Sequence, residues 1–564
     1  MKDFFYKKEK IILLIFSIFS VFISILEVFN LGIIIPFINI VNNSEKLLKF
    51  PLIFEIMEKL NIKKEKIIVI IGIIIISISI LKLIVITIYN IKLSSFLNKI
   101  YLRLTKTLLK KIMKMPYSEY LKENKSELIK LMIYETDKLT IIIKDIMIII
   151  SEIIIAVLLL LTMFFLNRKI FLFISIFSGI SLLCIKLLIL DKIKKIGIVK
   201  NKMVSKCFFS LEIIFENIKA LKILFSEKEN SIIENYYINT DKCLENEKKW
   251  NVLFPLSKQI FETLGIVLII LIIIFLCIES NNENKKILEI LIIFVVALYR
   301  LLPSIYRIVS AIQEVLYYKN AFIKIKQVLN YYSEKEGNLK ISYNKSILIE
   351  NLDFLFNNEK IFRISFLEIL KGERIGIVGV SGSGKSTFIN VLLGMYREKL
   401  KNIRIDDKEL SDKNIRDWYK KISYIPQEII LFDGTVADNI VFGRKYDQKK
   451  LENAIKLSRL DKIFSNYNYV VGDKGNLLSG GQRQRIVIAR ALYDEPEILI
   501  LDEATSSLDE KTEREIMEEI YNLNKNLTIL LITHRKSVLY GCDKILNFCK
   551  GKNIEIKVGE LNGK

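Results

Sequence analysis

The pattern of hydrophobic positions divides the chain into two parts. Long runs of Ile, Leu, Val and Phe fill the region up to about residue 315, whereas the remainder alternates short apolar and polar segments. Each run is long enough to cross a bilayer with a hydrocarbon core of about 30 Å. A signal peptide is the rival interpretation of the first run, which is too long and has no small-residue cleavage site. The pattern predicts six membrane-spanning helices: Ile11–Ile40, Ile67–Tyr89, Ile141–Leu166, Ile170–Leu190, Leu253–Ile278 and Ile287–Val309.

The connecting segments predict the orientation of these helices. Segments 91–139 and 191–250 are long and rich in lysine, whereas 167–169 and 279–286 are very short. Because cytoplasmic loops carry an excess of Lys and Arg, we expect both long segments and both termini to lie in the cytoplasm. The segment 41–66 is then external, and its apolar positions at helical spacing suit an interfacial helix or a packed connector equally well.

Composition narrows the class of protein. Hydrophobic residues make up 51% of the 564 residues, more than an ordinary soluble enzyme contains. The net charge of +22 could indicate nucleic acid, but no basic stretch has the aromatic residues that such a surface needs. A membrane protein with basic cytoplasmic segments explains the charge without a nucleic-acid partner. The six cysteines form no CxxC pair, and the single histidine, His534, cannot belong to a multi-histidine metal site.

Three cations lie inside the predicted membrane helices: Lys82, Arg300 and Arg307. The two arginines are seven residues apart and therefore share one helix face. Charge in a bilayer core is costly and tends to face a cavity or a partner. These residues predict either a cationic cavity wall for an anionic substrate or structural ion pairs. The candidate counter-charges are Glu27, Glu152 and Glu262.

The second part of the chain contains a phosphate-binding pattern, G-x-x-x-x-G-K-[ST], at Gly379–Thr387. An apolar strand precedes it and a helix follows it, which is the context this pattern requires. Glycines let several backbone N–H groups and a helix N-terminus point at one anion. Lys385 would place its charge at the β- and γ-phosphates, and the Ser386 hydroxyl would bind Mg²⁺. By itself the pattern could also be a chance glycine-rich turn.

Four further motifs follow in order. Gln427 ends a strand and offers a carbonyl oxygen to Mg²⁺ and an orienting group to water. Ser479-Gly480-Gly481 opens a helix whose N-terminus suits an anion. A buried strand ends in the carboxylates of Asp502 and Glu503, one suited to the metal and one to a water, and another strand ends at His534. Five motifs in this order leave almost no room for coincidence.

With these motifs the second part resembles the nucleotide-binding domain of ATP-binding cassette (ABC) proteins, and the whole chain resembles an ABC exporter half-transporter. The resemblance implies a six-helix transmembrane bundle followed by an α/β P-loop NTPase cassette, with ATP and Mg²⁺ as ligands. It divides the chain into 1–330, a linker 331–346 and the cassette 347–564. The nucleotide-binding residues it implies are Phe356 for adenine, with Gly379, Ser381, Gly382, Ser383, Gly384, Lys385, Ser386, Thr387, Gln427 and Asp509.

The resemblance also assigns roles to the motifs. Glu503 is implied as general base, Asp502 as a metal ligand together with Ser386 and Gln427, and His534 as the switch at the γ-phosphate. Ser479, Gly480 and Gly481 are implied to contact ATP on the opposite cassette, so that a dimer is required and a homodimer is expected. Segments Tyr117–Glu123 and about Phe208–Asn217 resemble the helices that couple the membrane domain to cassettes.

The membrane half is most similar to bacterial flippases for lipid-linked oligosaccharides, on the stretch Val296–Ser304 with Arg307 and on Ser126–Lys130. This implies a homodimer in the bacterial inner membrane that moves a polyprenyl-diphosphate-linked glycan. Lys82 stands where that family would have arginine. The open alternatives are an exporter of another lipid, a drug or a peptide, a soluble cassette ATPase acting on DNA or ribosomes, and a channel gated by ATP.

Overall fold

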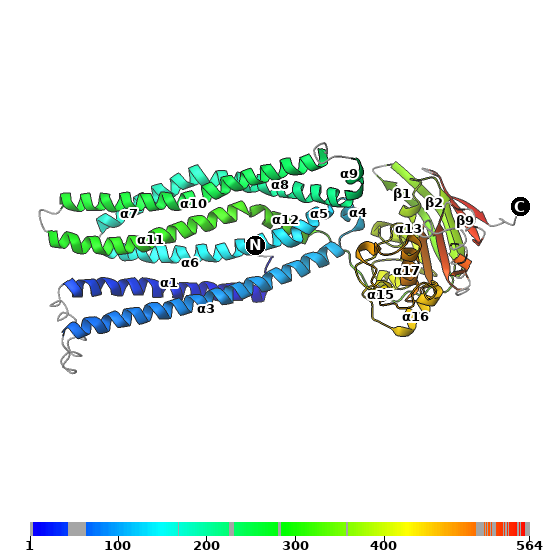
Figure 1. Ribbon diagram of the computed structural model, residues 1–564, viewed down its shortest axis with the longest axis horizontal. Helices are drawn as coiled ribbons and strands as arrows, with labels where there is room; N and C mark the ends of the chain where they lie inside the picture. The colour runs from blue at the N-terminus through cyan, green and yellow to red at the C-terminus, as the bar shows by residue number, and fades with distance from the viewer. Residues whose placement is uncertain are drawn as a thin grey trace. The chain divides into compact units, whose positions relative to one another are not determined.

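The computed structural model describes residues 4–42, 64–166, 168–224, 231–279, 284–356 and 359–503, and parts of 513–558. The chain forms two compact units, one of Met1–Met113 with Glu123–Tyr331 and one of Lys114–Lys122 with Tyr332–Lys564. The first unit is helical and the second contains both sheets (Figure 1). A helical membrane domain followed by a cassette is the predicted fold class.

The helical unit is built from long apolar helices. Its main helices are α1 (Lys7–Asn42), α3 (Lys64–Met113), α6 (Thr136–Leu166), α7 (Arg168–Ile185), α8 (Asp191–Glu216), α10 (Ser231–Glu279) and α11 (Asn284–Tyr317). Within the described residues, five helical stretches are long and apolar enough to cross a membrane. The sixth predicted span, 287–309, lies within α11. The external segment 43–63 lies outside the described residues.

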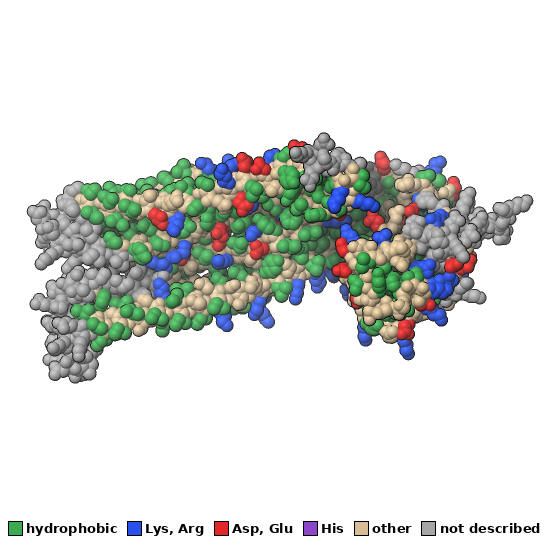
Figure 2. Space-filling model, in the orientation of Figure 1, with side chains coloured by type: hydrophobic (Ala, Val, Ile, Leu, Met, Phe, Trp, Pro, Cys, Tyr) green, Lys and Arg blue, Asp and Glu red, His purple; other side chains and the backbone are tan. Residues whose placement is uncertain are grey.

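Helices that continue past the predicted spans account for the two long basic segments. The α3 helix has 50 residues, or about 75 Å at 1.5 Å per residue, which exceeds the hydrocarbon thickness more than twofold. Likewise α10 has 49 residues. The space-filling view shows hydrophobic side chains over much of the helical unit (Figure 2). Exposed Ile, Leu and Phe side chains at this density are those of a lipid-facing surface.

Shorter helices interrupt the long ones. They are α4 (Tyr117–Tyr120), α5 (Lys125–Lys130), α9 (Ile218–Leu224) and α12 (Lys319–Asn330), with π-helical turns at Leu131–Glu135 and Lys186–Leu190. The first predicted coupling segment contains α4, whose Tyr117 ring lies edge-on to Tyr396, 6.1 Å between centroids. Residues 208–216 instead complete α8, and the separate short helix begins after Asn217, at Ile218.

The second unit contains two sheets. One has the order β2-β1-β4-β5, from strands Glu359–Leu370, Ser346–Phe356, Ile403–Ile405 and Lys408–Glu409. The other has the order β10-β9-β3-β8-β7-β6, from strands Glu555–Val558, Lys544–Phe548, Arg374–Gly379, Thr528–Ile532, Ile498–Asp502 and Ile422–Ile425. All pairs in the second sheet are parallel except β9 with β10. The α-helices that the structure describes in this unit are α13 (Lys385–Leu392), α14 (Ile415–Tyr419), α15 (Val436–Val441), α16 (Gln448–Leu457) and α17 (Gly480–Leu492).

Fully buried strands anchor this sheet. Every residue of β7 and of β8 is buried, as expected for parallel strands covered on both faces. The predicted linker is packed onto this unit as well: the N–H groups of Gly337 and Leu339 donate to the carbonyls of Asp412 and Lys413, and Tyr343 is buried.

Candidate functional site

The candidate site lies where four parallel strands end. Strand β3 runs into Gly379–Thr387, β7 ends at Asp502, and Gln427 follows β6. Because the order β3-β8-β7-β6 places these strands side by side, their carboxyl ends form one edge of the sheet. In open α/β sheets this edge is where ligands bind.

Glycines with positive φ shape the loop between β3 and α13. Gly379, Gly382 and Gly384 have φ of +148°, +77° and +98°. A Cβ on Gly379 would lie 2.4 Å from the carbonyl oxygen of Phe548, and one on Gly384 would lie 2.8 Å from the Phe362 ring. These positions therefore require glycine for backbone conformation and for space.

The loop presents donors suited to phosphate. Helix α13 begins at Lys385, so its first-turn N–H groups and its positive end face the loop. The Lys385 Nζ donates to the carbonyls of Gly379 at 2.7 Å and Val380 at 3.2 Å, which places its charge inside the loop. The buried Ser383 hydroxyl has no hydrogen-bond partner among the described residues. A nucleotide phosphate fits this set of donors.

Two oxygen groups suited to Mg²⁺ lie together. Asp502 is buried at the end of β7, where Tyr424 Oη donates to its Oδ2 at 3.3 Å. Burial raises the pKa of Asp502, and hydrogen bonds from Tyr424 and Ser386 oppose that shift. Carboxylate and hydroxyl oxygens are hard ligands of the kind Mg²⁺ prefers, so Ser386 and Asp502 would hold this ion beside the phosphates.

Gln427 and Glu503 lie in direct contact. The Gln427 amide Nε2 donates to Glu503 Oε2 at 2.7 Å, which leaves the amide oxygen to serve as a cation ligand. Glu503 has φ +49°, and its N–H donates to Ile532 O at 3.1 Å. A bulky residue with positive φ is uncommon, and such strain tends to occur at functional positions.

Ser479 caps helix α17, which begins at Gly480. The Gln482 N–H donates to Ser479 Oγ at 3.3 Å, and the Ser479 N–H donates to Gln482 Oε1 at 2.9 Å. This capping box orders the helix start at Gly480 and Gly481, where N–H groups are presented to an anion. His534, Asp509 and the Phe356 side chain lie outside the described residues.

Arg307, a membrane cation on α11, is ion-paired with a carboxylate on α6. Arg307 Nε lies 2.6 Å from Glu152 Oε1, its Nη2 donates to Oε2 at 3.3 Å, and Ser304 Oγ also donates to this carboxylate. The pair joins α11 to α6. Of the other counter-charges, Glu262 lies 3.7 Å from Lys258 on its own helix, and the Glu27 side chain lies outside the described residues. Arg300 and Lys82 are half-buried.

Three contacts of these sites did not follow from the sequence motifs: Tyr424 with Asp502, Gln427 with Glu503, and Ser304 with Glu152. Only the last had a sequence signal, because Ser304 lies three residues before Arg307 and thus on the same helix face.

Fold and site define a class: a helical membrane unit joined to a nucleotide-binding cassette. The model for the ABC transporter transmembrane region matches residues 10–300, and the ABC transporter model matches residues 363–506. The chain belongs to the ABC transporter family. The cassette of this family is an ATPase coupled to transport, and its half-transporters assemble as dimers.

Similar sequences and a similar structure are consistent with this family. The chain is 41% identical over 215 residues to a protein of Rickettsia typhi named for export ATP-binding and permease functions, covering 37% of each. A protein of Rickettsia felis with the same name is 31% identical over 374 residues, covering 62% of this chain and 63% of the relative. The match thus spans less than two thirds of these relatives. The fold is similar to a bacterial Atm1-family ABC exporter with ATP bound, with TM-score 0.78, 17% identity and coverage of 98% and 96%.

Proposed function

We propose that this chain is half of an ATP-driven exporter. The proposal is supported by five residues that lie at one edge of one sheet: Lys385, Ser386, Asp502, Gln427 and Glu503. The same chain has long apolar helices, five of them within the described residues. The loop would hold the phosphates of ATP, and Ser386, Gln427 and Asp502 would hold Mg²⁺, which supplies charge stabilisation at the transferred phosphoryl group.

Hydrolysis would use the residues at the strand ends. Glu503 would accept a proton from the attacking water, and Gln427, already bonded to Glu503, would orient that water. His534 would contact the γ-phosphate, Asp509 would contribute to nucleotide binding, and Phe356 would stack on adenine. Ser479, Gly480 and Gly481 would complete the site on a second copy, which makes the working unit a homodimer.

For location we propose the bacterial inner membrane, with the cassette and both termini in the cytoplasm. The support is the lysine content of segments 91–139 and 191–250, together with their continuation from the apolar helices.

For cargo we propose a polyprenyl-diphosphate-linked oligosaccharide; the alternative is another lipid, a drug or a peptide. The support is the set of cations on α3 and α11, because guanidinium groups bind phosphates bidentately. Arg307 is held in an ion pair with Glu152, so an anionic cargo would compete with that carboxylate for the guanidinium. For the drug alternative, the support is a multidrug resistance protein of Entamoeba histolytica that is 35% identical over 39% of this chain and 18% of that protein.

The test is ATP-dependent movement of such a lipid in proteoliposomes. We expect flipping by the parent protein and none by Glu503→Gln, which serves as the matched inactive control. If the protein hydrolyses ATP without flipping this lipid, and takes up a drug or peptide in an ATP-dependent way, the proposed cargo is wrong. The proposal that the protein is an exporter would still stand. Absence of Mg²⁺-ATP hydrolysis by the parent would refute the exporter itself.

A further inference from the structure

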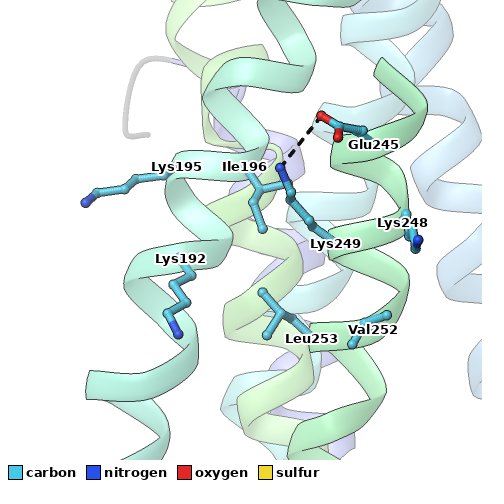
Figure 3. Close-up of a pocket in the computed structure, with 8 residues that line it drawn as sticks. All are labelled: Lys192, Lys195, Ile196, Glu245, Lys248, Lys249, Val252 and Leu253. Atoms are coloured by element: carbon cyan, nitrogen blue, oxygen red, sulfur yellow. Dashed lines mark ion pairs between the residues drawn. The ribbon is translucent and has the colours of Figure 1, made fainter. Parts of the chain in front are cut away.

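A groove lies between α8 and α10 at the level where both helices change from apolar to basic sequence. The apolar run that includes α7 ends at Leu190, and the basic helix α8 begins directly after it. In α10 the basic part comes first, and its apolar run begins at Leu253. The groove has a volume of about 610 Å³. Figure 3 shows Ile196 and Leu253 between the two helices, with Lys192 at the level of Leu253.

Four lysines line this groove against one carboxylate: Lys192, Lys195, Lys248 and Lys249, with Glu245. Lys249 and Glu245 are one turn apart on α10, 3.9 Å between charged atoms, and both are exposed. An exposed pair of this kind is weak. Among the described residues, no carboxylate lies within 4.0 Å of the other three ammonium groups. The groove is therefore strongly positive.

The neighbouring Trp250 marks the same level. Its ring stacks on Tyr317 with centroids 4.0 Å apart, at the boundary between the basic segment and the apolar run. The ring is packed against the helical core, so Trp250 fixes α10 against α11 just where the apolar run begins. An apolar floor, a cationic rim and this change from basic to apolar sequence place the groove at the headgroups of the leaflet that faces the basic segments.

We propose that this groove binds the headgroup phosphate of an anionic phospholipid in the cytoplasmic leaflet. The ammonium groups of Lys192 and Lys249, which lie between the two helices in Figure 3, would contact the phosphate, and Lys195 and Lys248 would add positive charge around them. The apolar side chains of Ile196, Val252 and Leu253 would contact the first methylenes of the acyl chains. The ligand is a resident lipid, distinct from the cargo, and the inference rests on the proposed orientation. A soluble anion would gain nothing from contact with the apolar side chains of the groove, whereas a lipid would.

The test uses full-length protein in nanodiscs of neutral phosphatidylcholine with a trace of photo-crosslinking phosphatidylglycerol. We expect crosslinks in the peptides around Lys192 and Lys249, and at least a fivefold loss in the variant Lys192→Gln/Lys195→Gln/Lys248→Gln. The matched control is Lys99→Gln/Lys106→Gln/Lys110→Gln, which removes three exposed lysines of α3 and should keep the crosslinks. Replacing the groove lysines by arginine should also keep them, which separates loss of charge from misfolding.

Three results would overturn the proposal. They are equal crosslinking by a phosphatidylcholine probe, loss of crosslinks when millimolar inorganic phosphate is added, and equal loss in the control variant. The first would mean a lipid contact without charge recognition, and the second a site for a free anion. Because crosslinking needs neither ATP nor cargo, failure of the proposed transport function would leave these outcomes unchanged.

Discussion

Replacing Arg307 by glutamine should destabilise the helical unit through the carboxylate it leaves behind. Glu152 has a side chain that is 10% exposed and that accepts two interactions from Arg307 and one from Ser304. In Arg307→Gln the hydroxyl of Ser304 remains as a donor to Glu152 among the described residues. The buried carboxylate loses the guanidinium that faced it, and this loss costs free energy.

The loss of stability in Arg307→Gln depends on how deeply the two charged side chains are buried. Breaking a buried ion pair by removing one partner costs about 3–5 kcal/mol. Since the Arg307 side chain is 38% exposed, we expect a smaller cost of about 2–3 kcal/mol. The double variant Glu152→Gln/Arg307→Gln removes both charges and keeps hydrogen-bonding groups, so it should return to within about 1 kcal/mol of the parent.

Thermal unfolding in detergent measures the difference. A cost of about 2–3 kcal/mol corresponds to a lowering of Tm by about 3–5 °C for a unit of about 320 residues. The reasoning is refuted if the single and double variants are equally destabilised, because the two side chains would then be uncoupled. An unchanged Tm for Arg307→Gln with complete loss of transport would assign this arginine to the cargo instead of to Glu152.

Three predictions concern the cassette. Glu503→Gln should abolish ATP hydrolysis and keep ATP binding, measured by turnover and by equilibrium binding; undiminished turnover would exclude Glu503 as the base. Gly379→Ala should destabilise the cassette by about 2 kcal/mol or more, seen in its unfolding, because its Cβ would meet the Phe548 carbonyl at 2.4 Å. Since burial raises the pKa of Asp502 and only its ionised form binds metal, acidification should weaken Mg²⁺ binding at a higher pH than for an exposed aspartate. The Asp502→Asn variant should lose that pH dependence of Mg²⁺ binding. If Mg²⁺ binding by the parent weakens at the pH expected for an exposed aspartate, the prediction is wrong.

The elements that could be predicted are those with a local physical cause. Runs of apolar residues must be helical in a bilayer because every backbone group needs an internal partner, so the spans followed from hydrophobicity alone. The turn at Gly379–Thr387 followed from glycine spacing, because positive φ and close approach leave no other residue type.

The contacts between elements could not be predicted in the same way. Gln427 and Glu503 are 76 residues apart, and the order of strands β6 and β7 in the sheet decides that they meet. The segment about Phe208–Asn217, which resembles a coupling helix in the sequence, belongs to α8 up to Glu216, and no glycine or proline marks the break that follows. Arg307 could equally face a cavity or a counter-charge, and only the packing of α11 on α6 brings it to Glu152.

The ion pair of Arg307 with Glu152 also allows a test of the charge of the cargo, which the unfolding measurement cannot provide. An anionic cargo that binds Arg307 must compete with Glu152 for the same guanidinium, so part of its binding free energy is spent on separating the pair. Glu152→Gln removes the competitor and should tighten binding of a diphosphate lipid by about tenfold, or about 1.4 kcal/mol. The readout is the KM for the lipid in ATP-dependent flipping, with Glu262→Gln as a control that removes an exposed carboxylate paired only along its own helix. An unchanged KM in Glu152→Gln would mean that Arg307 serves the packing of α6 on α11 and that the anion, if one is carried, is held elsewhere.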